Sequence, residues 1–175
     1  KAYLIGRLAP GIEDVAAAAD GPMREARDKV GLTAVLTAPS MSGMVVLKTV
    51  HGTTAIAIGA RPGSELPMHA SAQGFITLAF GPALHLERTL RQPLAPLTAH
   101  TITEPEALKA IVETVRQDGY ATAPEQALLG INALAAPVFN AAGELVAAAA
   151  IVSSIQFVPA KPDAGMIAAV VEMAR

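Results

Sequence analysis

Residues 131–152 have the sequence INALAAPVFNAAGELVAAAAIV, and this stretch sets the architecture that we expect. Two apolar runs, Asn132–Phe139 and Glu144–Val152, flank the four residues Asn140–Gly143. A short link that contains Asn and Gly between two such runs is typical of a β-hairpin. We therefore predict two neighbouring antiparallel strands near the end of the chain.

Further strands are expected upstream of this hairpin. Three short segments are rich in Val, Ile and Thr: Leu32–Thr37, Met44–Val50 and Thr54–Ala60. Turn-forming residues separate them, so we expect three strands joined by short links in an antiparallel meander. Tyr120–Thr122 has the composition of one more short strand. Together these segments predict a sheet of five or six mostly antiparallel strands.

Helices are expected at the start, in the middle and at the end of the chain. The helix near Thr103 has the clearest ends, because Thr103 and Glu106 form a capping box and Gly119 supplies a left-handed exit. The other helical ranges are 12–30 with a break at Asp20-Gly21-Pro22, Ser71–Phe80, Leu84–Leu90 and 163–175. This pattern predicts an α+β fold. Residues 1–175 contain no linker or repeat that would divide them, so we expect a single domain.

Composition excludes several classes of function. The chain has 175 residues, of which 52% are hydrophobic and 16% charged, so a packed domain is expected and not a disordered segment. Its net charge of −2 argues against direct binding of nucleic acid, which usually needs a basic face. No apolar run approaches the ~20 residues of a membrane span. The absence of cysteine excludes disulfides and thiolate chemistry, and it fits a cytoplasmic location.

No familiar catalytic or cofactor-binding motif is present. The four histidines have no partner at metal-ligand spacing, and neither a nucleophile elbow nor a phosphate-binding or dinucleotide-binding loop occurs. Glu104 and Glu106 are accounted for by the start of a helix, where acidic residues are favoured. The residues themselves therefore predict no enzyme, no metal and no cofactor.

The most informative stretch for function is Leu66–Gly74, with the sequence LPMHASAQG. A polar residue at the expected helix cap and small residues in the first turn leave backbone N–H groups open to a carboxylate or phosphate. The candidate ligand-binding residues here are His69, Ser71, Ala72 and Gln73. An ordinary helix start explains the same pattern. The hairpin alanines would form one wall of a cavity, but plain core packing explains them as well. For both stretches, a binding site and an ordinary structural role therefore stay open.

At these two stretches the sequence resembles the effector-binding domain of the IclR-type (isocitrate lyase regulator) transcription factors. The resemblance covers nearly the whole chain and lies in an ordered series of short motifs. The series is Tyr3–Arg7, Gly31, Gly63–Gly74, Thr101–Leu108, Gly119–Ala121, Gly130, Ala135–Phe139 and Gly143–Ala148.

This resemblance implies a GAF-like antiparallel sheet with helices packed on its faces and an enclosed pocket for a small-molecule effector. It also implies a homodimer or tetramer without enzymatic activity, cofactor or membrane partner. Members of the family bind DNA through an N-terminal winged helix-turn-helix domain. We expect that domain to be absent from residues 1–175, so that DNA is a partner only through the missing domain.

Individual pocket residues also follow from the resemblance. The backbone amides of Ala72 and Gln73 match the positions that meet the acid group of the effector. Four other pocket positions, where some family members place polar side chains, are apolar here: Ala123, Ala133, Ala150 and Val152. Phe75 replaces a lysine that is common in the family. Because burying polar ligand groups without hydrogen bonds costs about 1–3 kcal/mol each, we expect a largely apolar ligand such as an aromatic acid. Asn132 and Ser153 are candidates for one side-chain hydrogen bond.

Two alternatives to a regulator domain stay open. One is a stand-alone GAF-type sensor attached to another output. The other is a small acyl-handling enzyme, which needs a nucleophile beside a base. Ser71 with His69 is the candidate pair for that chemistry.

Overall fold

The computed structural model describes residues 12–40, 43–54 and 58–175. Its centre is an antiparallel sheet of six strands in the order β3-β2-β1-β6-β5-β4. The strands are β1 (Thr33–Pro39), β2 (Met44–Val50), β3 (Glu65–Leu66), β4 (Ala121–Thr122), β5 (Ile131–Phe139) and β6 (Leu145–Ser154). This sheet and the helices that cover it confirm the expected α+β fold.

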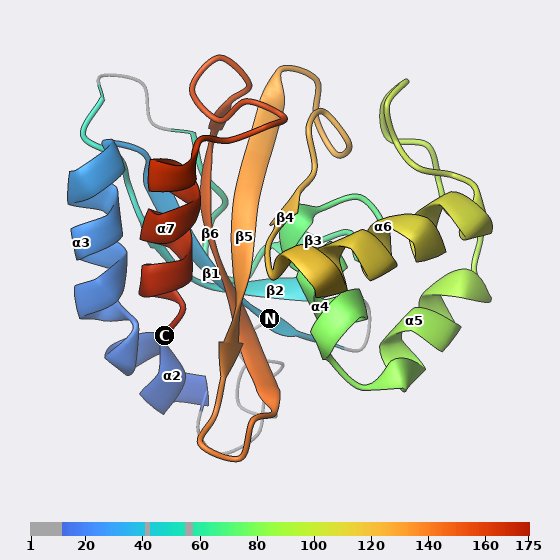
Figure 1. Ribbon diagram of the computed structural model, residues 1–175, viewed down its shortest axis with the longest axis horizontal. Helices are drawn as coiled ribbons and strands as arrows, with labels where there is room; N and C mark the ends of the chain where they lie inside the picture. Colours follow the sequence, from blue (N-terminus) through green and yellow to red (C-terminus); the bar gives the residue numbers. More distant parts are fainter. Residues whose placement is uncertain (1–11, 41–42, 55–57) are drawn as a thin grey trace.

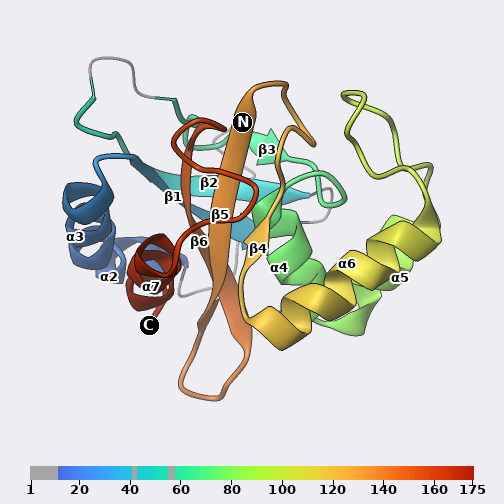
Figure 2. The ribbon, with the colours of Figure 1, turned by 45° about the horizontal axis from the view of Figure 1, so that its top comes forward.

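The predicted hairpin of residues 131–152 is formed by β5 and β6. The two strands pair from Ile131 opposite Ser154 to Phe139 opposite Leu145, and the hairpin projects beyond the helices at one end of the molecule (Figures 1 and 2). Gly143 closes the turn with a positive φ of 78°. The other edge of β6 pairs with β1, which places the alanine-rich strand in the middle of the sheet.

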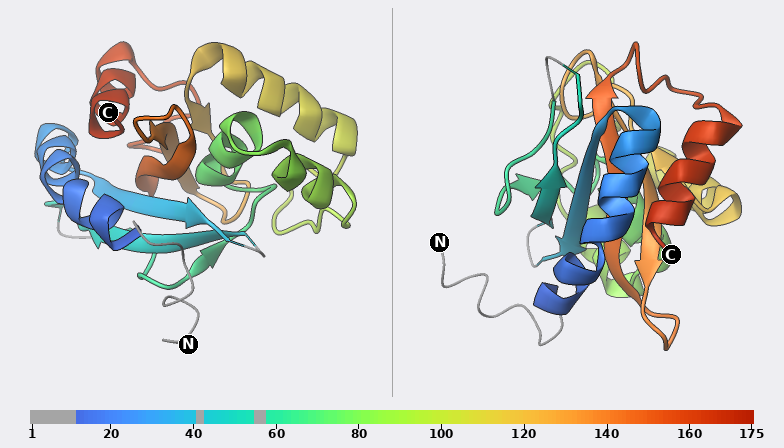
Figure 3. Two further views of the ribbon diagram at one scale, coloured as in Figure 1. Left: turned by 90° about the horizontal axis from the view of Figure 1, so that it is seen from below. Right: turned by 90° about the vertical axis from the view of Figure 1, so that its left-hand side faces the viewer.

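Helices cover both faces of this sheet. On one side lie α2 (Ile12–Ala18), α3 (Asp20–Val30) and α7 (Ala164–Met173), and on the other lie α4 (Ala72–Phe80), α5 (Ala83–Leu90) and α6 (Pro105–Asp118) (Figures 1 and 3). α3 and α7 pack side by side, and Lys29 Nζ lies 2.5 Å from Glu172 Oε2 between them. α4 is the inner helix of the second group, because it packs against β5, β6 and α6.

Side chains of β6 alternate between the two helix layers, as in any regular strand. Ala148 and Ala150 belong to the apolar core under α4 and α6, whereas Ala149 and Ile151 belong to the core under α3 and α7. Phe75 is fully buried in the α4 layer. Phe75 is therefore a core residue of this layer.

The expected strand Thr54–Ala60 lies only partly within the described residues. Residues 55–57 of the segment Thr54–Ala60 lie outside the described residues, as does Tyr3–Arg7, and the described remainder of that segment is not in a strand. Among the described residues, β2 pairs on its other edge with β3. Pro62 cannot donate to a strand ladder and Gly63 has a φ of 83°, so β3 begins only after this turn.

The predicted helix ends are confirmed at two glycines and wrong at two other positions. Gly31 and Gly119 end α3 and α6 in the left-handed conformation, as expected. The Thr103 capping box is wrong, because α6 begins at Pro105 with Glu104 as its cap residue. Proline suits the first helical position, where no N–H is needed, and this preference fixes the start of the helix. The break near residue 20 falls at Ala19, one residue before the predicted one.

Candidate functional site

The start of α4 is built by the segment Pro67–Gly74. Ser71 caps the helix: its Oγ accepts a hydrogen bond from Gly74 N at 3.1 Å and donates one to Pro67 O at 2.6 Å. A Cβ on Gly74 would lie 2.2 Å from Met68 O, so the helix and the preceding segment are in backbone contact. These contacts fix the direction in which the first N–H groups of α4 point.

The first two backbone N–H groups of α4 have no hydrogen-bond partner within the helix. Those of Ala72 and Gln73 have no acceptor among the described residues, because the Ser71 side chain serves Gly74 and the first intrahelical bond is donated by Phe75. Ala72 is fully buried and Gln73 is 3% exposed. The Gln73 side-chain amide also makes no hydrogen bond to a described residue. Buried backbone N–H groups normally have partners, so the free amides of Ala72 and Gln73 point to a ligand or to ordered water.

Apolar side chains of the sheet lie in the same core as the start of α4. Ala123, Ala133 and Ala150 belong to the core under α4 together with Ala72. Val152 pairs with Ala133 and lies two residues from Ala150, so it faces the same layer. The structure thus brings six of the nine predicted residues to one face of the sheet: Ala72, Gln73, Ala123, Ala133, Ala150 and Val152. Their side chains present methyl groups and one amide.

Asn132 and Ser153 lie on the opposite face of the sheet. They are paired with each other, and each is adjacent in its strand to a residue of the α4 layer. Both donors and both acceptor positions of the Asn132 amide are already used: Oδ1 accepts from Ala123 N and Ala133 N, and Nδ2 donates to two carbonyls of residues 158–159. Asn132 therefore positions the Ala123 wall and has no hydrogen bond left for a ligand.

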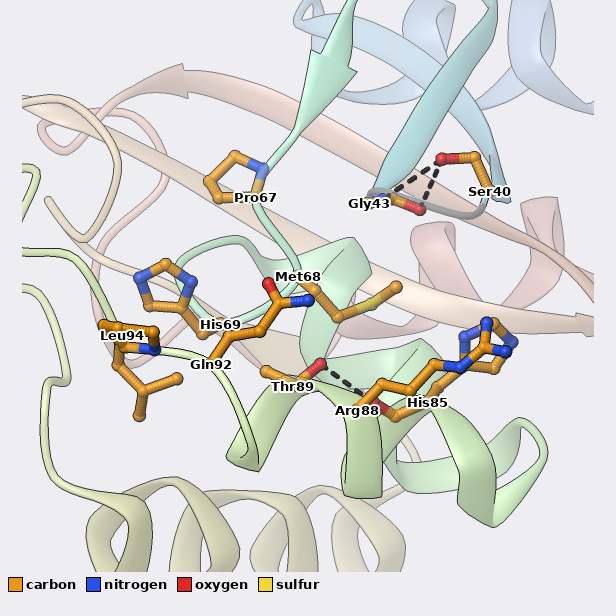
Figure 4. Close-up of a pocket in the computed structure, with 11 residues that line it drawn as sticks. Ser40, Gly43, Pro67, Met68, His69, His85, Arg88, Thr89, Gln92 and Leu94 are labelled. Atoms are coloured by element: carbon orange, nitrogen blue, oxygen red, sulfur yellow. Dashed lines mark hydrogen bonds between the residues drawn. The ribbon is translucent and has the colours of Figure 1, made fainter.

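A cleft of about 210 Å³ lies beside the start of α4 (Figure 4). Pro67, Met68 and His69 form one wall, and α5 and the residues after it form the other. His69 is the one predicted site residue among those that line the cleft, and its Nε2 lies 3.0 Å from Ala95 O. The other predicted residues lie deeper, in the α4 core or, for Asn132, on the far face of the sheet.

Comparison with known sequences decides the family. Residues 11–175 match the family described as "Bacterial transcriptional regulator IclR C-terminal". The chain belongs to this IclR family. Its relatives include the probable transcriptional regulator SauR of Cupriavidus necator, which is 34% identical over 137 residues. That alignment covers 78% of this chain and 54% of SauR, so the chain spans about half the length of this regulator.

Solved IclR structures share the fold. The IclR of Thermotoga maritima superposes with a TM-score of 0.81 and 27% identity, over 98% of this chain and 68% of that one. An IclR homolog from Microbacterium hydrocarbonoxydans, complexed with 4-hydroxybenzoate, gives a TM-score of 0.81 and 26% identity over the same shares of the two chains. The family and these relatives are transcriptional regulators, which agrees with the prediction that the chain is not an enzyme.

The acyl-handling alternative has no support in the geometry of the IclR domain. Ser71 Oγ donates its proton to Pro67 O, and the His69 ring nitrogen contacts Ala95 O, so the two side chains do not form a nucleophile–base pair. Among the described residues, no group of three His, Cys, Asp or Glu side chains is placed to hold a metal ion. No described helix is long and apolar enough to cross a membrane.

Sequence reasoning missed the residues of α5 that line the cleft. His85, Arg88 and Thr89 all face it, as does Gln92 just beyond the helix. The pKa of His85 is lowered, first by burial and then by the nearby Arg88 charge. A weak signal was present, since residues three and four apart share a helix face and His85, Arg88 and Thr89 have this spacing.

Proposed function

We propose that this chain is the effector-sensing domain of an IclR-type regulator and that the start of α4 binds the acidic end of a small aromatic carboxylate. The observation that carries this proposal is the pair of buried N–H groups of Ala72 and Gln73 without an acceptor among the described residues. A helix N-terminus favours an anion through these free donors and through the helix dipole.

The surrounding methyl groups favour an apolar body on the ligand. Ala123, Ala133, Ala150 and Val152 offer no side-chain hydrogen bond to a hydroxyl or keto group. Leaving such a ligand group unpaired costs about 1–3 kcal/mol, whereas an aromatic ring of ~150 Å² gains about 4 kcal/mol on burial. Benzoates are therefore preferred over glyoxylate or pyruvate. The 4-hydroxybenzoate bound to the Microbacterium homolog supports this choice of ligand class.

The role of the whole protein extends the same proposal. In a homodimer or tetramer, effector binding modulates the DNA affinity of an N-terminal winged helix-turn-helix domain. The whole protein acts in the cytoplasm, where it reaches DNA. A ligand shifts such an equilibrium only if it binds the DNA-binding and non-binding arrangements with different affinities.

Removing one N–H from the proposed anion site tests the proposal directly. Ala72 occupies the first helical position, where proline is tolerated, and the extended conformation of Ser71 suits a residue before proline. Ala72→Pro deletes the N–H and places a ring carbon where the carboxylate would bind. Ala83→Pro is the matched control, because Ala83 is the first residue of α5 and is exposed.

Calorimetric titration of the chain with benzoate, 4-hydroxybenzoate, glyoxylate and pyruvate supplies the readout. Loss of one charge-assisted hydrogen bond of about 1.5–3 kcal/mol predicts at least roughly tenfold weaker benzoate binding by Ala72→Pro and no change for Ala83→Pro. Gln73→Leu, with Gln117→Leu on the exposed side of α6 as its control, covers the case in which Ala72→Pro fails to fold. Unchanged benzoate binding by folded Ala72→Pro, or tighter binding of pyruvate than of any benzoate, contradicts the proposal.

A further inference from the structure

The side chain of Gln73 differs from three other buried polar side chains of the α4 layer. Thr37, Ser71 and Thr77 each donate a hydrogen bond to an acceptor of the protein, at 3.2, 2.6 and 3.0 Å respectively. Gln73 is 3% exposed, and no hydrogen bond joins its side-chain amide to a described residue. Buried amides normally have partners, so the amide of Gln73 requires a partner from outside the chain.

The Gln73 amide is not sealed inside the protein. Among the described residues, Arg27 Nε is the one side-chain nitrogen or oxygen that is fully enclosed and has no hydrogen bond. Since the Gln73 amide also has no hydrogen bond, its nitrogen and oxygen border a gap that atoms of water size can enter. The small exposed fraction of Gln73 means that this gap is narrow. A narrow gap of this kind suits the polar end of a ligand.

Helix geometry directs the Gln73 side chain toward the free backbone N–H groups of α4. The Cα–Cβ bonds of an α-helix tilt toward its N-terminus, and long side chains follow this direction. Gln73 is the second residue of α4, so its side chain extends toward the end at which the N–H groups of Ala72 and Gln73 are free. Thr77, one turn later on the same helix face, contacts Met44 of β2, so this face is turned to the sheet. The side-chain amide therefore lies beside the proposed position of the acid group.

An amide recognises more than a carboxylate. Its nitrogen donates hydrogen bonds and its oxygen accepts them, whereas a carboxylate only accepts. A simple benzoate therefore leaves the Gln73 Oε1 without a donor. A ligand that carries an N–H or O–H group next to its carboxylate satisfies both ends of the amide. On a benzoate ring this is the ortho position, since a para substituent lies at the opposite end of the ring. An ortho amine has two N–H groups, so one can bond to the carboxylate of the ligand and the other to Oε1.

We infer that Gln73 is a specificity-determining residue of the α4 site, which selects aromatic acids with a hydrogen-bond donor ortho to the carboxylate, such as 2-aminobenzoate. This inference rests on the proposed function, because it concerns the same site. The backbone N–H groups of Ala72 and Gln73 bind the carboxylate together with the Gln73 Nε2. The Gln73 Oε1 accepts from the ortho donor. The amide of Gln73 thus contributes to ligand affinity and not to the stability of the fold.

Two acids of nearly equal size test this selection. 2-Aminobenzoate carries the ortho donor, and 2-methylbenzoate has almost the same shape without it. Each is titrated calorimetrically into the wild-type chain and into Gln73→Leu. Loss of one neutral hydrogen bond predicts that the affinity for 2-aminobenzoate relative to 2-methylbenzoate falls about fivefold in Gln73→Leu. The exposed control Gln117→Leu should leave this ratio unchanged. Gln73→Met, which is apolar and as long as glutamine, is the second variant if Gln73→Leu does not fold.

Urea denaturation separates a ligand contact from a structural role of Gln73. An amide without a protein partner does not stabilise the fold, so both Gln73 variants should have a free energy of unfolding equal to or above that of the wild type. A clear loss of stability in both variants would show that the amide has a partner in the protein, and it would overturn the inference. An affinity ratio that is the same in the wild type and the variants also overturns it, but leaves the proposed function intact. If neither acid binds the wild type, the proposed function fails together with it.

Discussion

Replacing Gly74 with alanine is expected to destabilise the domain, although alanine is the better helix former. The new Cβ would lie 2.2, 2.7 and 2.8 Å from the O, C and Cα atoms of Met68, all of them backbone atoms. An ordinary contact needs about 3.4 Å, so α4 or the Pro67–His69 segment must shift by roughly 1 Å. Overpacking of this kind costs about 2–4 kcal/mol, and helix propensity returns at most ~1 kcal/mol. The net loss is about 1–3 kcal/mol.

Urea denaturation of the wild type and variant measures this loss as a change in the free energy of unfolding. Gly165→Ala is the matched control, because Gly165 lies in the first turn of α7, is exposed, and has as its nearest neighbour the Asp163 side chain at 3.3 Å. That variant should change stability by less than ~1 kcal/mol. If Gly74→Ala is as stable as the wild type, the close backbone contact that orients the α4 amides does not exist.

Two further predictions concern other parts of the fold. Asn132→Ala should lower the free energy of unfolding by about 3 kcal/mol, because two N–H and two C=O groups lose the side-chain partner that they share. Urea denaturation measures this change. A loss below ~1 kcal/mol would show that the hydrogen bonds of Asn132 contribute little to stability. The Arg24 side chain, and then Lys48, hold the pKa of Asp20 at about 2 instead of 3.8. A depressed carboxyl pKa stabilises the folded state above pH 3.8 and loses this effect as the pH falls toward 2. The denaturation midpoint of the wild type should therefore fall more steeply between pH 5 and pH 2 than that of Asp20→Asn, and parallel curves would contradict the ion-pair assignment.

Local sequence rules succeeded where the determining contacts are short in range. Gly31 and Gly119 end their helices as predicted, because the left-handed conformation depends on one residue and its immediate neighbours. The same rules erred at Thr103, where two signals for a helix start overlapped and Pro105 decided. The period of two in a strand already separates Asn132 from Ala133, so their placement on opposite faces could have been foreseen from the sequence.

The sequence by itself determined the hairpin, the glycine ends of two helices and the family, because each depends on residues close together in the chain or on an ordered series of motifs. Only the tertiary structure decided which groups meet. The cleft joins Ser40, Met68 and Arg88 from three separate segments, and the start of α4 is buried by strands more than fifty residues away in the chain. Such contacts depend on how the helices pack on the sheet, and no local pattern in the sequence specifies that packing.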